Sequence, residues 1–138
     1  MQKADLVKVY RVIDANLNRA KEGLRVCEDV FRFVLDDKVL TRKLKKIRHD
    51  LTEIITVSEI EKFIQFRNIE RDVGKGSVSQ EMNRGTVQDV LCANCQRVKE
   101  SVRVLEEFMK LEDPKRALRL KNLRYDLYAI EKKIIKVG

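Results

Sequence analysis

Hydrophobic residues recur at steps of three and four positions over four long segments of the chain. The first segment spans residues 12–35, and Asp36-Asp37 can end it and cap the second, which spans 40–55. A third spans 87–108, and a fourth follows Asp113-Pro114, where Asp suits the N-cap and Pro the first helical turn. This periodicity predicts four long amphipathic helices.

The positions expected to face the core share this helical spacing. They are Ile13, Leu17, Ala20, Leu24, Cys27, Phe31 and Val34 in the first segment; Leu40, Leu44, Ile47, Leu51, Ile54 and Ile55 in the second; Val87, Val90, Leu91, Val98, Val102, Leu105 and Phe108 in the third; and Leu118, Leu123, Leu127, Ile130 and Ile134 in the fourth.

The middle of the chain breaks this pattern. Residues 67–86 are polar and irregular, contain Gly74, Gly76 and Gly85, and follow a short helix expected at 58–66. A loop of this length inside a compact domain is more often functional than a plain connection. We therefore expect this loop to take part in the function of the domain.

An internal repeat is the strongest signal in the sequence. Residues 15–28 match 93–106 with 8 of 14 positions identical, and residues 48–54 match 124–130 with 4 of 7 identical. One helical hairpin cannot bury its apolar face alone, whereas two hairpins packed face to face can. The repeat predicts an all-α bundle of two duplicated hairpins with pseudo-twofold symmetry. Its single domain spans residues 1–138, with repeat one at about 11–57, a central loop at about 67–86 and repeat two at about 87–136.

Polar residues are kept between the repeats at positions where the apolar residues change. The unchanged pairs are Asn16/Asn94, Arg19/Arg97, Glu22/Glu100, Arg25/Arg103 and Arg48/Arg124. Asn16 falls inside the apolar arc and Arg19 on its border, and a buried Asn is costly unless it is hydrogen-bonded. In one interpretation the asparagines bind each other or a backbone carbonyl, and the charged residues form surface ion pairs. For the set as a whole we favour a charged cleft between the hairpins that binds phosphate or carboxylate through arginine.

Composition narrows the classes of partner. The chain has 30 Lys and Arg against 22 Asp and Glu, a formal charge of +8, which favours anionic partners. Hydrophobic residues make up 43% and charged residues 38%, so the chain is neither disordered nor membrane-spanning. One Pro, five Gly and 6% aromatic residues argue against an all-β fold, and there is no aromatic platform for nucleic acid. With no signal peptide and an odd count of three Cys, the expected location is cytoplasmic.

Three short motifs carry weaker signals. Cys92 and Cys95 form a C-x-x-C, but it lies in a predicted helix without a second ligand pair, which argues against zinc or redox chemistry. His49 has Tyr125 as its repeat partner, which indicates a binding position more than a proton shuttle. The stretch 74–77 is no Walker motif, although its backbone N–H groups and Lys75 remain candidates for a phosphate contact.

Long motifs along the chain resemble one known family. They are Asp14–Asp29, Arg32-Phe33, Leu35–Asp37, Leu44–Leu51, Arg71–Gly74, Asp89–Asn94, Arg97, Glu100, Arg103, Leu105–Glu107 and Leu123–Tyr125. They resemble the helical domain found at the N-terminus of some bacterial thiamine-phosphate synthases and also as a stand-alone protein, the form that this chain resembles. The family is described as a monofunctional hydroxymethylpyrimidine phosphate kinase. The resemblance therefore implies conversion of 4-amino-5-hydroxymethyl-2-methylpyrimidine phosphate to its diphosphate by ATP, with Mg²⁺, in thiamine biosynthesis.

The site residues expected for this chemistry are mostly cationic, because the acceptor phosphate is already anionic at neutral pH and needs little base catalysis. The catalytic candidates are Arg19, Arg97, Arg48 and Arg124. The candidates for binding substrate or nucleotide are Asn16, Asn94, Glu22, Glu100, Arg25, Arg103, His49, Arg71, Asp72, Gly74, Lys75 and Arg84. The candidate metal ligands are Asp14, Asp72, Glu22 and Glu100.

Other functions remain open at this stage. The main alternative is a non-catalytic module that senses anions or docks onto a thiamine enzyme. A small all-α mutase acting on an anionic dicarboxylate and a basic nucleic-acid binder are further alternatives, the latter with steep salt dependence. Thiamine-phosphate synthase is a candidate partner. The sequence leaves open the oligomeric state, a homodimer included, and which repeat binds donor or acceptor.

Overall fold

The computed structural model describes residues 2–76 and 82–137, with side chains described up to residue 134. Its elements are the helices α1 (Lys3–Asp29), α2 (Lys38–Ile54), α3 (Val57–Ile64), α5 (Val87–Met109) and α6 (Pro114–Val137), and the short π-helix η1 (Val30–Val34) between α1 and α2. No strand occurs within the described ranges, which confirms the all-α prediction. None of the described helices combines the length and the apolar character that a membrane span requires.

Acidic or hydroxyl side chains cap the N-termini of α2, α5 and α6. The Asp37 carboxylate accepts the Leu40 N–H of α2 at 2.9 Å, and the Asp113 carboxylate accepts the Lys115 N–H of α6 at 3.0 Å. The Thr86 hydroxyl accepts the Asp89 N–H of α5 at 3.0 Å, and the Asp89 carboxylate returns a bond to the Thr86 N–H. Each bond satisfies a backbone N–H that the helix leaves unpaired. The predicted caps at Asp37 and Asp113 are therefore confirmed.

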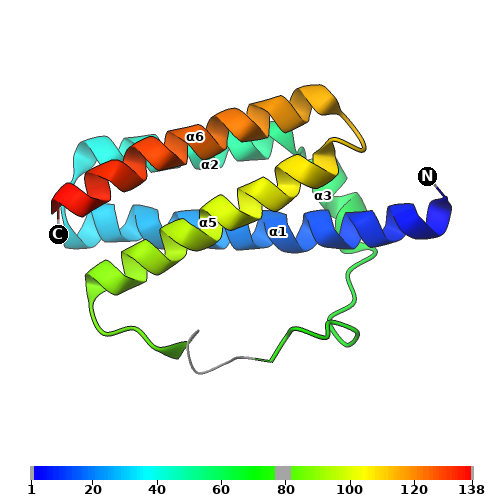
Figure 1. Ribbon diagram of the computed structural model, residues 1–138, viewed down its shortest axis with the longest axis horizontal. Helices are drawn as coiled ribbons and strands as arrows, with labels where there is room; N and C mark the ends of the chain where they lie inside the picture. Colours follow the sequence, from blue (N-terminus) through cyan, green and yellow to red (C-terminus); the bar gives the residue numbers. More distant parts are fainter. Residues whose placement is uncertain (1, 77–81, 138) are drawn as a thin grey trace.

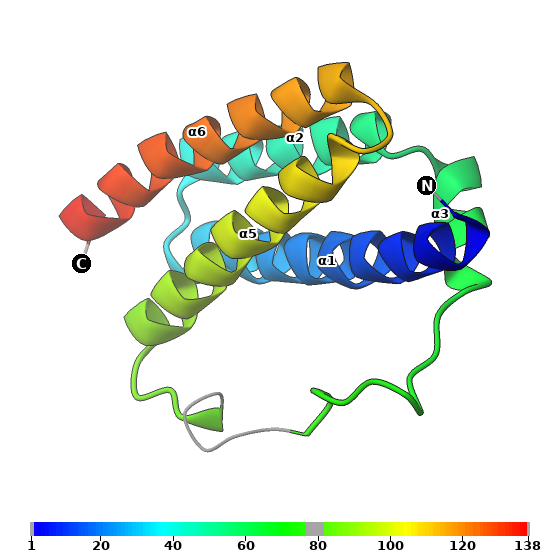
Figure 2. The same ribbon diagram turned by 45° about the vertical axis from the view of Figure 1, so that its right-hand side comes forward.

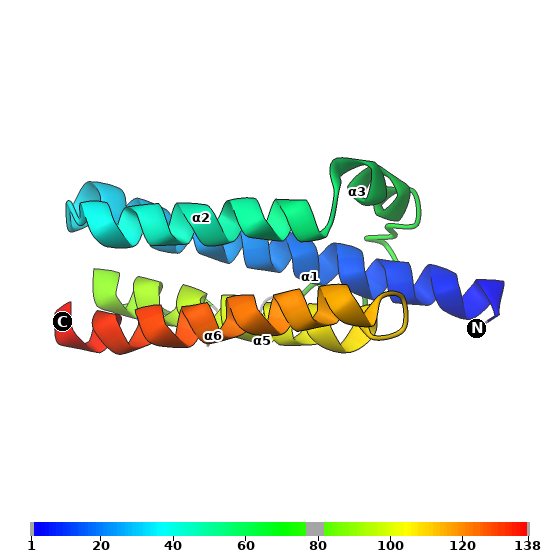
Figure 3. The same ribbon diagram turned by 90° about the horizontal axis from the view of Figure 1, so that it is seen from above.

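The helices form two antiparallel hairpins, α1–α2 and α5–α6. Figure 3 shows the hairpins as two adjacent layers, and Figures 1 and 2 show α1 against α5 and α2 against α6. Gly23 of α1 lies against Asn94 and Val98 of α5, and Asn16 and Ser101 line one hollow. Because Asn94 and Ser101 are the repeat counterparts of Asn16 and Gly23, this arrangement is the one that the predicted pseudo-twofold symmetry requires.

Gly23 sets how closely the two central helices approach. A Cβ atom at Gly23 would lie 2.6 Å from Val98 Cγ2 and 3.2 Å from the Asn94 carbonyl oxygen. Its counterpart Ser101 is also buried and donates its hydroxyl to the Arg97 carbonyl at 2.7 Å. Only a residue without a side chain fits between α1 and α5 at this point.

The core follows the predicted stripes, with three exceptions that face solvent. Val34, Val87 and Leu118 are 54%, 47% and 59% exposed. Val34 belongs to η1, where the wider turn carries the chain away from the core, and Val87 is the first residue of α5. At the start of α6 the buried positions are Ala117 and Leu120, so Leu118 points outward. Val90 and Phe108 are only half-buried.

The predicted loop is present on one side of the bundle. Helix α3 ends at Ile64, earlier than the predicted 66, and residues 67–76 and 83–86 are irregular, while residues 77–81 of the predicted loop lie outside the described ranges. Figures 1 and 2 show that the loop runs past α1 and α5 on the side away from α2 and α6. The loop therefore faces the surface where the two repeats cross.

Candidate anion-binding groove

The two equivalent arginines, Arg19 and Arg97, border the same hollow where α1 and α5 cross. This central hollow has a volume of about 370 Å³. Its lining residues come from both repeats and are Asn16, Arg19, Arg97, Glu100, Ser101 and Val104. Neither arginine forms an ion pair with another residue of the described chain. Two guanidinium groups without carboxylate partners at one hollow leave their donors available to an anion.

The asparagines beside these arginines are satisfied by the backbone. Asn16 donates to the Val12 carbonyl at 2.9 Å, and Asn94 donates to the Val90 carbonyl at 2.8 Å. This confirms the simpler of the two interpretations for the amide nitrogens. The Asn16 oxygen in turn accepts a hydrogen bond from Arg19 at 3.4 Å. Asn16 is only 5% exposed, so it orients the Arg19 side chain from within the helix interface.

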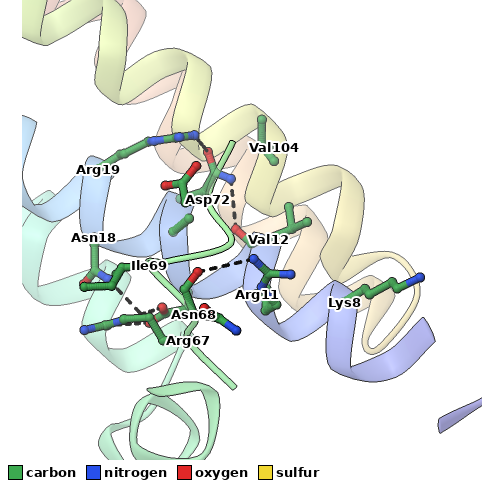
Figure 4. A pocket seen from close by; sticks show the side chains of 13 residues that line it. Lys8, Arg11, Val12, Asn18, Arg19, Arg67, Asn68, Ile69, Asp72 and Val104 are labelled. Carbon is green, nitrogen blue, oxygen red and sulfur yellow. Dashed lines mark hydrogen bonds and ion pairs between the residues drawn. The ribbon is translucent and has the colours of Figure 1, made fainter. Parts of the chain in front are cut away.

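A larger hollow opens between the N-terminal half of α1 and the start of the loop. Its volume is about 780 Å³, and it shares Asn16, Arg19 and Val104 with the central hollow, so the two form one groove. Figure 4 shows Arg11 and Asn18 of α1 facing the loop residues Asn68 and Arg67. Its charged lining residues are Lys8, Arg11, Asp14, Arg19, Arg67 and Asp72. Five cationic and three acidic side chains border the whole groove.

An ion pair fixes the loop against α1. Arg67 donates to both oxygens of Asp14, each at 2.7 Å, and Asn18 donates to the same carboxylate at 3.4 Å. The bond to Asp14 raises the pKa of the Arg67 guanidinium. Asp14 is 5% exposed, so this two-pronged contact joins a buried carboxylate to the first residue of the loop. Asp14, predicted as a candidate metal ligand, is here the partner of Arg67.

A third hollow adjoins the central one on the α5–α6 side. Its volume is about 430 Å³, and it shares Glu100 and Val104 with the central hollow. The remaining lining residues are Gln96, Lys99, Arg103, Arg124 and Tyr128. Arg103 lies 3.0 Å from Glu107, and Arg124 donates to the Tyr128 hydroxyl at 2.8 Å. The cations of this hollow therefore already have partners.

Arg48 and Arg124, predicted as catalytic, lie in the seams within each hairpin. Arg124 Nε is 2.9 Å from Glu106 Oε2, and both side chains are buried. Arg48 lies 3.4 Å from Glu28, which also accepts Arg25 at 2.9 Å. The bonds to Glu106 and then to Tyr128 raise the pKa of Arg124. Both arginines pair with repeated, buried glutamates, and Arg124 also lines the third hollow.

The remaining predicted residues divide between the groove and the surface. Glu100 and Asp72 border the groove, whereas Glu22, Arg25 and His49 are exposed and lie outside its hollows. The loop residues that also lie outside them are Arg71, Gly74, Lys75 and Arg84.

Sequence reasoning missed three cationic residues of the groove. Lys8 and Arg11 lie one turn apart and precede Asn16 on the same helix, a spacing that was available as a signal. Arg67 carries no such local signal, because it is held in the groove by its bond to Asp14, which lies 53 residues away in the sequence.

Among the described residues, no group of three or more His, Cys, Asp or Glu side chains could hold a metal ion. Burial raises the pKa of the Cys27 thiol to about 12 and that of Cys95 to about 11. Cys92 is exposed and Cys95 is buried. The Cys27 and Cys95 thiols therefore differ from the accessible, low-pKa type that is typical of reactive cysteines.

Sequence comparisons place the chain among known proteins. The profile of the ThiD2 family matches residues 11–133. The chain belongs to the ThiD2 family. No solved structure matches this ThiD2 family member.

Curated relatives of this family member are thiamine-phosphate synthases. Those of Prochlorococcus marinus strain AS9601 and Synechocystis sp. are 38% and 40% identical, over 91% and 95% of this chain but 35% and 37% of their own. That of Prochlorococcus marinus strain MIT 9313 is 41% identical over 98% of this chain and 37% of its own. The chain thus spans about a third of the length of these relatives, in which the same domain is fused to a longer protein.

Proposed function

We propose that this ThiD2 family member phosphorylates 4-amino-5-hydroxymethyl-2-methylpyrimidine phosphate to the diphosphate with ATP, in thiamine biosynthesis. One observation carries the proposal: Arg19 and Arg97, equivalent in the two repeats, border one hollow and have no carboxylate partner among the described residues. The thiamine-phosphate synthase relatives support the pathway. Their fused form also supports an association of this domain with that enzyme.

The reaction requires cations more than a base. An oxygen of the acceptor phosphate attacks the γ-phosphorus of ATP and forms the new P–O bond. The bond from the γ-phosphorus to the β–γ bridging oxygen breaks, and ADP leaves with the electron pair. Both reactants are polyanions, and a phosphate monoester is largely dianionic at neutral pH. The main obstacle is therefore their mutual repulsion, which arginines in a fixed arrangement reduce in the transition state.

The groove offers a role for each central residue. Arg19, held by Asn16, and Arg97 approach the central hollow from opposite repeats, so they can contact the acceptor phosphate and the transferred phosphoryl group together. Arg48 and Arg124, with their glutamate partners, hold each hairpin together. We assign catalysis to Arg19 and Arg97 and a structural role to Arg48 and Arg124.

The groove also fits a magnesium ion. Asp72 and Glu100 border it and, unlike Asp14, have no cationic partner among the described residues. Magnesium is usually held by one or two carboxylates together with substrate phosphates and water, so these two residues would hold it. When bound, the ion neutralises charge on the β- and γ-phosphates.

The direct test is formation of the diphosphate by the purified chain. The protein is incubated with ATP, Mg²⁺ and the pyrimidine phosphate, and product is separated by anion-exchange chromatography. Arg97→Ala, prepared in the same way, controls for contaminating kinases. We expect product with the native chain and almost none with Arg97→Ala.

Two results would contradict the proposal. Equal product from both preparations would mean that Arg97 takes no part in forming the diphosphate, whether the product comes from a contaminating kinase or from other residues of the chain. Binding of the pyrimidine phosphate in calorimetry without any product would instead favour the sensor or docking module.

A further inference from the structure

Apart from Arg19, the charged α1 residues that line the larger hollow are not kept in the second repeat. At the repeat offset of 78, Lys8 corresponds to Thr86, Arg11 to Asp89 and Asp14 to Cys92. Thr86 is the residue that caps α5, so the turn of α1 that carries Lys8 has no counterpart in α5. The central hollow, in contrast, has Arg19 and Arg97 from both repeats. The groove therefore has a duplicated centre and one unduplicated arm.

We propose that this unduplicated arm is the nucleotide site, with Lys8 and Arg11 binding the triphosphate, and that the pyrimidine phosphate occupies the central hollow. The assignment rests on the proposed kinase function and specifies which reactant each part of the groove receives. Lys8 lies outside the matched family region, residues 11–133.

Size and free charge both favour this assignment. The arm has about 780 Å³ against about 370 Å³ for the central hollow, and a nucleoside triphosphate is the larger reactant. Lys8 and Arg11 form no ion pair with the described residues, and the only described partner of the Arg11 guanidinium is the Asn68 carbonyl at 3.5 Å. In the third hollow the cations Lys99, Arg103 and Arg124 each have an acidic partner. Lys8 and Arg11 therefore add two cations without acidic partners among the described residues to those of the central hollow, whereas the cations of the third hollow are all paired.

The Asp14–Arg67 pair completes the arm as a positioning contact. It holds Asn68 beside Arg11, while Lys8 lies further along α1 and points away from the loop (Figure 4). At the equivalent position of the second repeat, Cys92 cannot bind an arginine in this way. The contact that holds the loop therefore forms in the first repeat, and the loop lines the part of the groove that is assigned to the nucleotide.

The test measures the binding of each reactant separately by calorimetry. The probes are a nonhydrolysable ATP analogue with Mg²⁺ and the pyrimidine phosphate alone. The variants are Lys8→Ala and Arg11→Ala, with Lys3→Ala in the same helix and Arg119→Ala on α6 as matched controls. Both controls are exposed residues outside the groove. We expect each groove variant to weaken nucleotide binding about tenfold, since it removes a charge-assisted contact, and to change pyrimidine phosphate binding less than twofold.

The outcomes separate this inference from the proposed function. Unchanged nucleotide binding in both groove variants, or a loss confined to the pyrimidine phosphate, would overturn the assignment while diphosphate formation by the native chain still supported the kinase. A native chain that binds both probes but forms no diphosphate would contradict the kinase. If Lys8→Ala and Arg11→Ala weaken nucleotide binding in that case, the nucleotide site is still supported.

Discussion

The two hairpins of this ThiD2 family member share their helical framework but differ in the side chains that line the groove beside the loop. Each has an arginine at the helix crossing, Arg19 or Arg97, and in its seam an arginine paired with a buried glutamate. Only the first has Lys8, Arg11 and the Asp14–Arg67 contact. Under the proposed function, the shared parts build the bundle and the reactive centre, whereas the unshared parts distinguish the donor from the acceptor. Two identical halves would present the same site twice, which suits two identical ligands better than a donor and an acceptor.

The largest expected effect tests whether the two central arginines are equivalent. Arg19→Ala and Arg97→Ala should each lower the turnover of pyrimidine phosphate by about 10³-fold, because each removes a cation from the transferred phosphoryl group. Thermal unfolding should change little, since neither side chain is buried or ion-paired within the described chain. Steady-state kinetics and circular dichroism measure both, with Arg119→Ala as control. A near-normal rate in either variant would show that the halves do not share the reaction.

The seam pairs should differ in stability between the repeats. Arg124 and Glu106 side chains are 10% and 6% exposed, whereas Arg48 is 22% exposed. Glu106→Gln should therefore cost about 3 kcal/mol, because it leaves a buried guanidinium without its charge partner, and Glu28→Gln about 1–2 kcal/mol. Urea unfolding measures the difference. A larger loss of unfolding free energy in Glu28→Gln than in Glu106→Gln would contradict the greater contribution expected from the Arg124–Glu106 pair.

A smaller effect is expected at the helix crossing. Gly23→Ala places a methyl group 2.6 Å from Val98 Cγ2, so α1 and α5 must separate. We expect a loss of about 1–2 kcal/mol, since overpacking exceeds the gain in helix propensity. Ser101→Ala, at the equivalent position, loses one hydrogen bond and should cost less than about 1 kcal/mol. Equal losses in urea unfolding would indicate that the close approach is not confined to Gly23.

The smallest effect concerns the thiols. Burial raises the pKa of Cys27 to about 12 and that of Cys95 to about 11, whereas Cys92, the counterpart of Asp14, is exposed. At pH 8 a thiol reagent should modify one cysteine rapidly, and the other two only after unfolding. Because the buried thiols stay neutral, their contribution to stability is present below the ordinary thiol pKa of about 8.5 and is lost as the pH rises toward their folded values. Rapid modification of two thiols in the native protein would contradict this burial.

Much of the frame follows from local pattern. The helices, the caps at Asp37 and Asp113 and the paired hairpins were predictable because helical spacing and capping act over a few residues. Val34 and Leu118 were misplaced because a stripe of apolar residues does not report a π-turn or the rotation of a helix at its start.

The groove was predictable only in part, because ion pairing joins residues that are distant in sequence. Repetition correctly brought Arg19 and Arg97 to one place. The same repetition also selected Arg48 and Arg124, whose glutamate partners lie 20 and 18 residues away and place them in the seams. Lys8 and Arg11 precede the repeated stretch, which begins at residue 15, so the repeat gives no signal at their positions.

The long connection between α3 and α5 means that the covalent link between the halves is separable from the interface that holds them. Each half contains a complete hairpin, and the buried contacts between α1 and α5 do not depend on the loop backbone. Two polypeptides divided between Gly74 and Gly76 should therefore recombine as a complementing pair of fragments. Such a pair would allow one half to be isotopically labelled or substituted while the other stays native.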